Sequence, residues 1–301
     1  MNRRRFLENA AIVAGTAALR AGSPVKAESA ARRKLKKSVG LYMVEGSESV
    51  LDQFKLLKDL GFDGVEVTGG SYSSRDEIVA ARDKTGLPIH SVVVGSHWKY
   101  PLSDPDPEIR EKGLEGLKHD LGEAKFFGAN VILFVPARVD ERTAYDEAYT
   151  RSQEGIRKTL PLAEKLGITI LIENVWNNFL LSPLEAVRYV DEFNSPFVKA
   201  YFDVGNIMLY GWPEHWIRIL GKRIRRIHIK EFSRRKAQDE GLWKGFEVEL
   251  LEGDNNWPAI MKTVQATGYN EEIGWYTAEI PGGDRGRLQA IAERMDRILA
   301  I

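Results

Sequence analysis

Four ionisable residues stand at the ends of short apolar runs in the second half of the chain. A buried strand at such a point would normally pass straight into a loop. The four residues are Glu173, Asp203, His228 and Glu279. Taken singly, an acidic residue at a strand end often caps a helix or pairs with a lysine, and a lone histidine in a strand is usually a core residue. Four on consecutive predicted strands indicate one shared site.

Three carboxylates brought together would repel one another and carry a large desolvation cost unless a cation were present. Oxygen-rich ligands with one imidazole favour a divalent ion, Mn²⁺ first, with Mg²⁺, Co²⁺ or Zn²⁺ as alternatives. Such an ion can stabilise the enediolate formed when a proton next to a carbonyl is removed. A carboxylate on each face of that carbon could remove and return the proton. The residues therefore predict metal-dependent chemistry on a hydroxy-carbonyl substrate.

The elements that must position these residues follow a repeating pattern. Short runs rich in Val, Ile and aromatic residues predict strands at 38–43, 64–68, 88–95, 130–135, 168–174, 198–204, 225–230 and 273–280. Amphipathic segments between them predict helices that include 49–60, 109–127, 145–166, 183–193, 257–267 and 284–299.

Eight β-then-α units predict a single closed parallel (β/α)8 barrel over residues 31–301, an α/β fold. An open doubly wound sheet would usually carry a glycine-rich phosphate loop after the first strand, and residues 43–47 (MVEGS) lack that pattern. The long charged segment 232–256 follows the seventh strand, so we expect it to lie over the active-site face as a lid.

Residues 1–30 have the pattern of a twin-arginine (Tat) signal peptide. Arg3-Arg4-Arg5-Phe6-Leu7 precedes a short apolar run and then small residues, with a cleavage point expected after Ala27. Ten apolar residues are too few to span a bilayer, so a permanent anchor is the weaker interpretation. The sequence thus predicts a folded protein exported to the periplasm, with no membrane span in the mature chain.

Composition agrees with a globular enzyme and argues against nucleic acid as a partner. The chain is 43% hydrophobic and 29% charged, and it has no cysteine, so thiolate metal sites are excluded. Without residues 1–27 it would keep 38 basic and 42 acidic residues, a net charge near −4. A chain with this net charge lacks the excess of positive charge that binds the phosphate backbone of nucleic acids. Homo-oligomer formation stays open.

The sequence resembles the xylose isomerase-like barrels known as sugar phosphate isomerases and epimerases, over nearly all of residues 37–300. Its pattern is closest to the L-ribulose-5-phosphate 3-epimerase-like members. The matching segments are 95–102 (GSHWKYPL), 201–206 (YFDVGN), 228–230 (HIK) and 252–254 (EGD). The resemblance implies that Glu173, Asp203, His228 and Glu279 bind the metal, and that the two glutamates are also the acid/base pair.

The resemblance also implies residues that contact the substrate. Asn206 matches an asparagine of phosphopentulose epimerases, whereas Arg234 matches an arginine that contacts substrate in the free-sugar enzymes. His97 is expected to contact the substrate, and Glu66 and Lys230 to support the site. Because a phosphorylated pentulose is a cytoplasmic intermediate, an exported relative is expected to act on an unphosphorylated sugar, sugar acid or keto-glycoside.

Three other functions compete with a sugar isomerase or epimerase. A lyase or glycoside-cleaving enzyme on 3-keto sugars could use the same enediolate to expel a neighbouring oxygen. An enzyme resembling endonuclease IV would need several zinc-binding histidines, whereas this chain has five histidines and no basic excess. A non-catalytic periplasmic sugar-binding barrel would have no need of two opposed proton-transfer groups such as Glu173 and Glu279.

Overall fold

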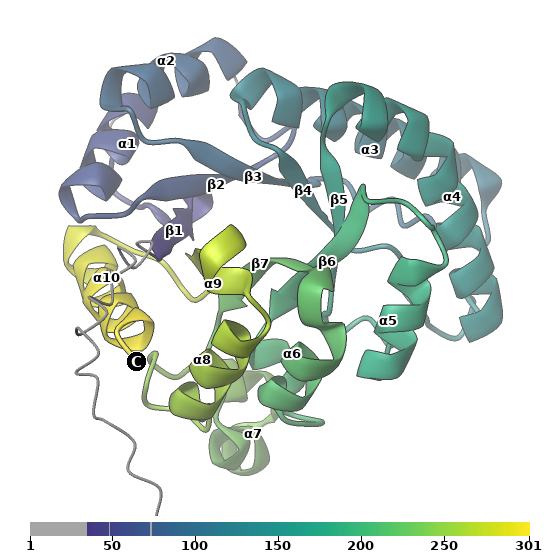
Figure 1. Ribbon diagram of the computed structural model, residues 1–301. Helices are drawn as coiled ribbons and strands as arrows, with labels where there is room; N and C mark the ends of the chain where they lie inside the picture. The colour runs from purple at the N-terminus through teal and green to yellow at the C-terminus, as the bar shows by residue number, and fades with distance from the viewer. Residues whose placement is uncertain (1–34, 48, 73) are drawn as a thin grey trace, which may run out of the picture. The chain divides into compact units, whose positions relative to one another are not determined.

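Within the described residues, eight parallel strands close into a barrel in the order of the chain (Figure 1). The computed structural model describes residues 35–47, 49–72 and 74–301, so the predicted signal peptide over 1–30 lies outside the described residues. The strands are β1 (Lys36–Gly40), β2 (Gly64–Thr68), β3 (Ile89–Val93), β4 (Val131–Phe134), β5 (Thr169–Glu173), β6 (Val198–Asp203), β7 (Ile224–Ile229) and β8 (Trp275–Ala278). Pairing of β8 with β1, from Lys36 opposite Trp275, closes the ring.

Helices follow the strands and form the outer layer of the barrel (Figure 1). They are α1 (Val50–Asp59), α2 (Arg75–Thr85), α3 (Pro107–Phe127), α4 (Tyr145–Leu166), α5 (Pro183–Asp191), α6 (Pro213–Leu220), α7 (Arg234–Glu240), α8 (Trp257–Ala266), α9 (Tyr269–Glu272) and α10 (Arg285–Leu299). Short 3-10 helices are η1 (Leu41–Met43), η2 (Gly205–Ile207), η3 (Gly221–Arg223) and η4 (Leu242–Phe246). No helix of the described ranges is long and apolar enough to cross a membrane.

Local sequence sets where the long helices end. α3 and α4 stop at Gly128 and Gly167, whose backbones are left-handed with φ values of 80° and 71°. Glycine adopts this conformation without the steric cost that a Cβ would add. Each glycine turns the chain directly into the next strand, which keeps the β-then-α repeat in phase.

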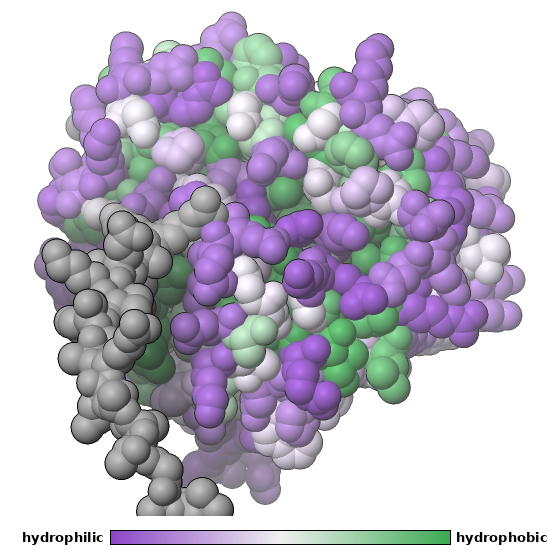
Figure 2. Space-filling view, viewed as in Figure 1, coloured by the Kyte–Doolittle hydropathy of each residue, from purple (hydrophilic) through white to green (hydrophobic). Residues whose placement is uncertain are grey.

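Alternation along the strands decides which side chains enter the barrel. Leu171 and Tyr201 belong to a small apolar cluster of their own, whereas Ile172 and Phe202 belong to the main core. Because side chains alternate along a strand, residues two positions apart point the same way. Glu173, two positions after Leu171, therefore shares its inward direction, as Asp203 shares that of Tyr201. Hydrophilic residues cover most of the outer surface seen in Figure 2.

The predicted closed barrel is confirmed, with two local differences. The expected strand 38–43 ends early, because Leu41–Met43 form η1 and the backbone N–H of Val44 donates to the carbonyl of Leu41. This turn buries both Leu41 and Met43, which an extended strand would place in line along one face. The segment 232–256, expected as a loop, holds α7 and η4.

Candidate metal centre and active site

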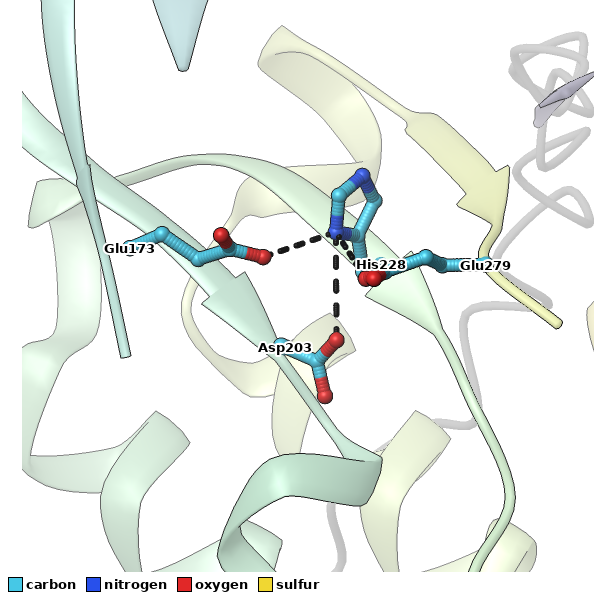
Figure 3. A group of neighbouring side chains, drawn as sticks. All are labelled: Glu173, Asp203, His228 and Glu279. Atoms are coloured by element: carbon cyan, nitrogen blue, oxygen red, sulfur yellow. Dashed lines mark hydrogen bonds and ion pairs between the residues drawn. The ribbon is translucent and has the colours of Figure 1, made fainter. Parts of the chain in front are cut away.

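The four predicted ligands meet at the mouth of the barrel. Glu173 ends β5, Asp203 ends β6, His228 is the penultimate residue of β7, and Glu279 directly follows β8. One potential ligand atom from each lies within 4.8 Å of the others. Figure 3 shows Glu173 and Glu279 entering from opposite sides, with the His228 ring and the Asp203 carboxylate between them. We call these four residues the tetrad.

Nδ1 of His228 is the centre of the tetrad. It lies 2.9 Å from Oε1 of Glu173, 2.8 Å from Oε2 of Glu279 and 3.8 Å from Oδ2 of Asp203 (Figure 3). Although burial disfavours a charged ring, the surrounding anions raise the pKa of His228 well above its usual value. The geometry therefore gathers three acidic oxygens around one imidazole nitrogen.

Two buried oxygens of the tetrad, Oδ2 of Asp203 and Oε2 of Glu279, take part in no hydrogen bond of ordinary geometry among the described residues. Oε2 of Glu279 lies against Nδ1 of His228, which also contacts Glu173. Burial raises the pKa of Asp203 well above its usual value, and burial together with the charge of Glu279 raises the pKa of Glu173. Buried carboxylate oxygens without a hydrogen bond are costly, and a divalent cation would stabilise both. One imidazole with three carboxylates is a donor set that fits such an ion.

Glu66 on β2 contacts the other nitrogen of the His228 ring. Its Oε1 lies 3.1 Å from Nε2 of His228, and its Oε2 accepts a 2.8 Å hydrogen bond from the hydroxyl of Tyr201. The Glu66 side chain is fully buried in the barrel interior. With the Nε2 proton directed at Glu66, Nδ1 can present its lone pair to a metal.

Lys230, just after β7, contacts two members of the tetrad. Its Nζ lies 3.1 Å from Oε1 of Glu279 and 3.7 Å from Oδ2 of Asp203. Burial opposes the charge of Lys230, but these carboxylates outweigh it and raise the lysine pKa. In turn Lys230 and His228 hold the pKa of Glu279 well below its usual value, against the effect of burial. Lys230 therefore keeps Glu279 ionised and fixes one of its oxygens.

Two asparagines lock Asp203 in place. Asn174 donates from Nδ2 to the backbone carbonyl of Asp203 and accepts from its backbone N–H, at 2.8 and 3.0 Å. The backbone N–H of Asn206 donates to Oδ1 of Asp203 at 2.7 Å, and its side-chain amide donates to the carbonyl of Asn174. These bonds leave only Oδ2 of Asp203 free to face the other ligands. Asn206, which the resemblance predicts to contact the substrate, orients Asp203 in this structure.

The structure does not bring His97 or Arg234 into contact with the tetrad. Nδ1 of His97 accepts a long 3.4 Å bond from the backbone of Val135, and burial lowers its pKa to about 4. The Arg234 guanidinium donates to the carbonyls of Met208 and Gly211, both at 2.8 Å. In this conformation the Arg234 guanidinium holds the loop after β6.

Tyr42 is a residue that the sequence interpretation missed. Burial, followed by the carboxylates of Glu279 and Glu66, raises its pKa, although the residue is 55% exposed. Gly40 makes room for the ring, because a Cβ there would lie 2.2 Å from a Tyr42 carbon. The only sequence signal was its position just after the first strand.

A second acidic cluster lies on α3, with Asp120 and Glu123 both buried. Asp120 accepts a hydrogen bond from the backbone N–H of Gly95, and Glu123 accepts one from that of Gly70. These carboxylates therefore anchor the loops after β3 and β2 to α3, which gives them a structural role.

Several known proteins are similar to this chain. L-ribulose-5-phosphate 3-epimerase of Salmonella typhimurium is 28% identical over 247 residues, which cover 77% of this chain and 84% of that protein. Among solved structures, 3-keto-D-glucoside 4-epimerase of E. coli matches with a TM-score of 0.72 at 18% identity, covering 89% of this chain and all of that one. An L-ribulose 3-epimerase matches with a TM-score of 0.72 at 14% identity, covering 89% and 95%. The xylose isomerase-like TIM barrel family model matches residues 54–301, and the chain belongs to that family.

Proposed function

We propose that this protein is a divalent-metal-dependent sugar epimerase or isomerase that moves a proton at the carbon next to a carbonyl. The observation that carries the proposal is the placement of Glu173 and Glu279 on opposite sides of the tetrad (Figure 3). Inversion at a carbon needs one group to remove a proton from one face and another to supply a proton to the opposite face. Two opposed carboxylates meet that need.

The relatives support the class of reaction. Those reported above are named as epimerases: one for a ketopentose phosphate, one for a ketopentose and one for a 3-keto-glucoside. All three substrate names describe a sugar with a carbonyl, so they agree with proton removal next to that group.

The tetrad would hold one divalent ion, with Mn²⁺ our first choice and Mg²⁺, Co²⁺ or Zn²⁺ as alternatives. When bound, the ion would polarise the substrate carbonyl and stabilise the negative charge that follows deprotonation. His228 and Asp203 are held in fixed orientations by Glu66, Asn174 and Asn206, so they suit a purely binding role.

The two glutamates have different partners, which suits different roles in each direction of the reaction. Lys230 holds one oxygen of Glu279 and favours its ionised form, so Glu279 is ready to accept a proton. The Glu173 carboxylate contacts only His228 among the described side chains, and burial raises its pKa. In the reverse reaction the two exchange roles.

We also propose that residues 1–30 direct export by the twin-arginine route to the periplasm. Folding before export would allow metal loading in the cytoplasm. Such a location favours a small unphosphorylated sugar or sugar derivative as substrate, because phosphorylated pentuloses are cytoplasmic intermediates.

Proton exchange with solvent tests the reaction class. Mn²⁺-loaded protein would be incubated in deuterated water with ketoses, keto-glycosides and their phosphates, and the products followed by NMR. We expect deuterium at the carbon next to the carbonyl, together with the epimer or isomer. Release of a glycosidic group instead would support the lyase alternative, and metal-dependent binding without any exchange would support a sugar-binding barrel.

Replacing each glutamate by glutamine tests the two-base mechanism on any substrate that the parent protein converts. Glutamine keeps the size and one oxygen donor but cannot accept the proton, so turnover should fall by about two to four orders of magnitude in each variant. Glu173→Gln and Glu279→Gln should each retain solvent exchange for only one epimer, and for opposite epimers. Near wild-type turnover in either variant would refute the mechanism.

A further inference from the structure

Four aromatic side chains form a platform beside the tetrad. The aromatic platform consists of Trp176, Tyr210, Trp243 and Phe246. The ring centroid of Trp176 lies 4.8 Å from those of Trp243 and Phe246 and 6.3 Å from that of Tyr210. The rings come from the segments that follow β5, β6 and β7, so only the closed barrel brings them together.

Two of the four platform rings are open to solvent, and the other two support them. Trp243 is 66% exposed and Tyr210 is 72% exposed, whereas Trp176 and Phe246 are half-buried. Trp176 donates from Nε1 to the carbonyl of Asn206 at 2.8 Å, and the fully buried Phe232 packs against Trp176 at 5.8 Å. Large apolar side chains that stay exposed together on a fixed support are typical of a binding surface.

Lys230 connects the platform to the tetrad. Its Nζ lies 3.1 Å from Oε1 of Glu279 and 4.8 Å from the centroid of the Phe246 ring. A ligand whose reacting group lies at the tetrad can therefore extend past Lys230 onto the aromatic rings. The flat, weakly polar face of such a ring suits the C–H face of a second sugar ring, whose hydroxyls point outward to water.

The charged residues beside the platform argue against a phosphate group as the part of the ligand that lies on the aromatic rings. Lys230 is paired with Glu279 and Asp203, and the Arg234 guanidinium is used by two backbone carbonyls. Lys244, next to Trp243, contacts both carboxylate oxygens of Glu247 at 2.7 and 3.0 Å. A phosphate group would have to break one of these contacts to gain a cation.

We propose that the aromatic platform binds the second sugar ring of an unphosphorylated keto-glycoside whose carbonyl-bearing unit lies at the tetrad. The assignment of the carbonyl-bearing unit rests on the proposed function. The role of the platform rests on its own exposure, support and position.

Calorimetric titration of Mn²⁺-loaded protein tests this proposal with four probes. D-Fructose supplies the ketose alone, lactulose and isomaltulose add a second ring through different linkages, and D-fructose 6-phosphate adds a phosphate. We expect at least one keto-disaccharide to bind about tenfold tighter than fructose, and Trp243→Ala to remove most of that preference, as expected when an aromatic binding residue is truncated. Trp243→Phe should retain part of it, and the binding of fructose itself should not change.

Phe126→Ala is the matched control, because Phe126 is a 39% exposed aromatic residue on α3 that has no contact with the platform. It should leave all four affinities unchanged. The proposal is overturned if no disaccharide binds tighter than fructose, if the phosphate ester binds tightest, or if Trp243→Ala keeps the preference. Measuring proton exchange with solvent distinguishes failure of the platform proposal from failure of the proposed function. If a disaccharide binds tighter but no proton exchanges, only the proposed epimerase activity is refuted. If the proton of fructose exchanges but no disaccharide binds tighter, only the proposed role of the aromatic platform is refuted.

Discussion

Substitution of Glu66 provides a quantitative test of how a buried residue of the barrel interior affects the metal affinity of the tetrad. Its carboxylate links Nε2 of His228, at 3.1 Å, to the hydroxyl of Tyr201, at 2.8 Å. In Glu66→Gln the side-chain oxygen can still accept from Nε2, and the new NH₂ group can donate to the tyrosine oxygen. The fold should therefore survive, while the negative charge that raises the basicity of the imidazole is lost.

Loss of a carboxylate behind a metal-binding histidine typically lowers metal affinity about 10- to 100-fold. Each factor of ten corresponds to about 1.4 kcal/mol, so the expected loss for Glu66→Gln is about 1.4 to 2.8 kcal/mol. Glu66→Ala should lose more, because it also leaves a cavity and leaves the Tyr201 hydroxyl with only its longer 3.2 Å contact to Thr277. The two variants together separate the effect of charge from that of packing.

The assay is competition for Mn²⁺ between the metal-free protein and a coloured chelator, with thermal unfolding measured in parallel. Glu123→Gln is the matched control, because Glu123 is equally buried but accepts from the backbone of Gly70, away from the tetrad. It should affect stability without changing Mn²⁺ affinity. If Glu66→Gln binds Mn²⁺ as tightly as the parent protein, the positioning role of Glu66 is wrong.

Three further predictions follow from other parts of the molecule. Metal analysis should find one divalent ion per chain in the parent protein and a clearly lower content in His228→Ala and Asp203→Asn, and full occupancy in both variants would contradict the tetrad. Because burial lowers the pKa of His97 to about 4, the unfolded chain binds a proton there that the folded chain does not, so stability should fall between pH 6.5 and 4 by up to about 3 kcal/mol. Urea unfolding at pH 7 and 4.5 measures this fall, and an equal fall in His97→Gln would show that His97 is not its cause. Changing Arg3 and Arg4 to lysine should retain the precursor in the cytoplasm, as cell fractionation would show, and normal export of that variant would rule out the Tat interpretation.

The sequence by itself determined the barrel and the tetrad. Hydrophobic periodicity is a local signal, and it placed β2 at residues 64–68 and α4 at 145–166, as the structure has them. In a closed parallel barrel the carboxyl ends of all strands meet on one face. Polar residues at consecutive strand ends could therefore be brought together without knowing any distance between them.

Only the tertiary structure decided how the supporting residues act. Glu66 and His228 are 162 positions apart, and their contact depends on closure of the barrel and on the inward direction of both side chains. The two backbone carbonyls that Arg234 contacts in the loop after β6 were likewise not predictable from its position in the sequence. The aromatic platform likewise depends on segments after three strands that no periodic pattern describes. Local patterns are set by neighbouring residues, whereas these contacts are set by which distant strands lie opposite each other and by how the loops fold over them.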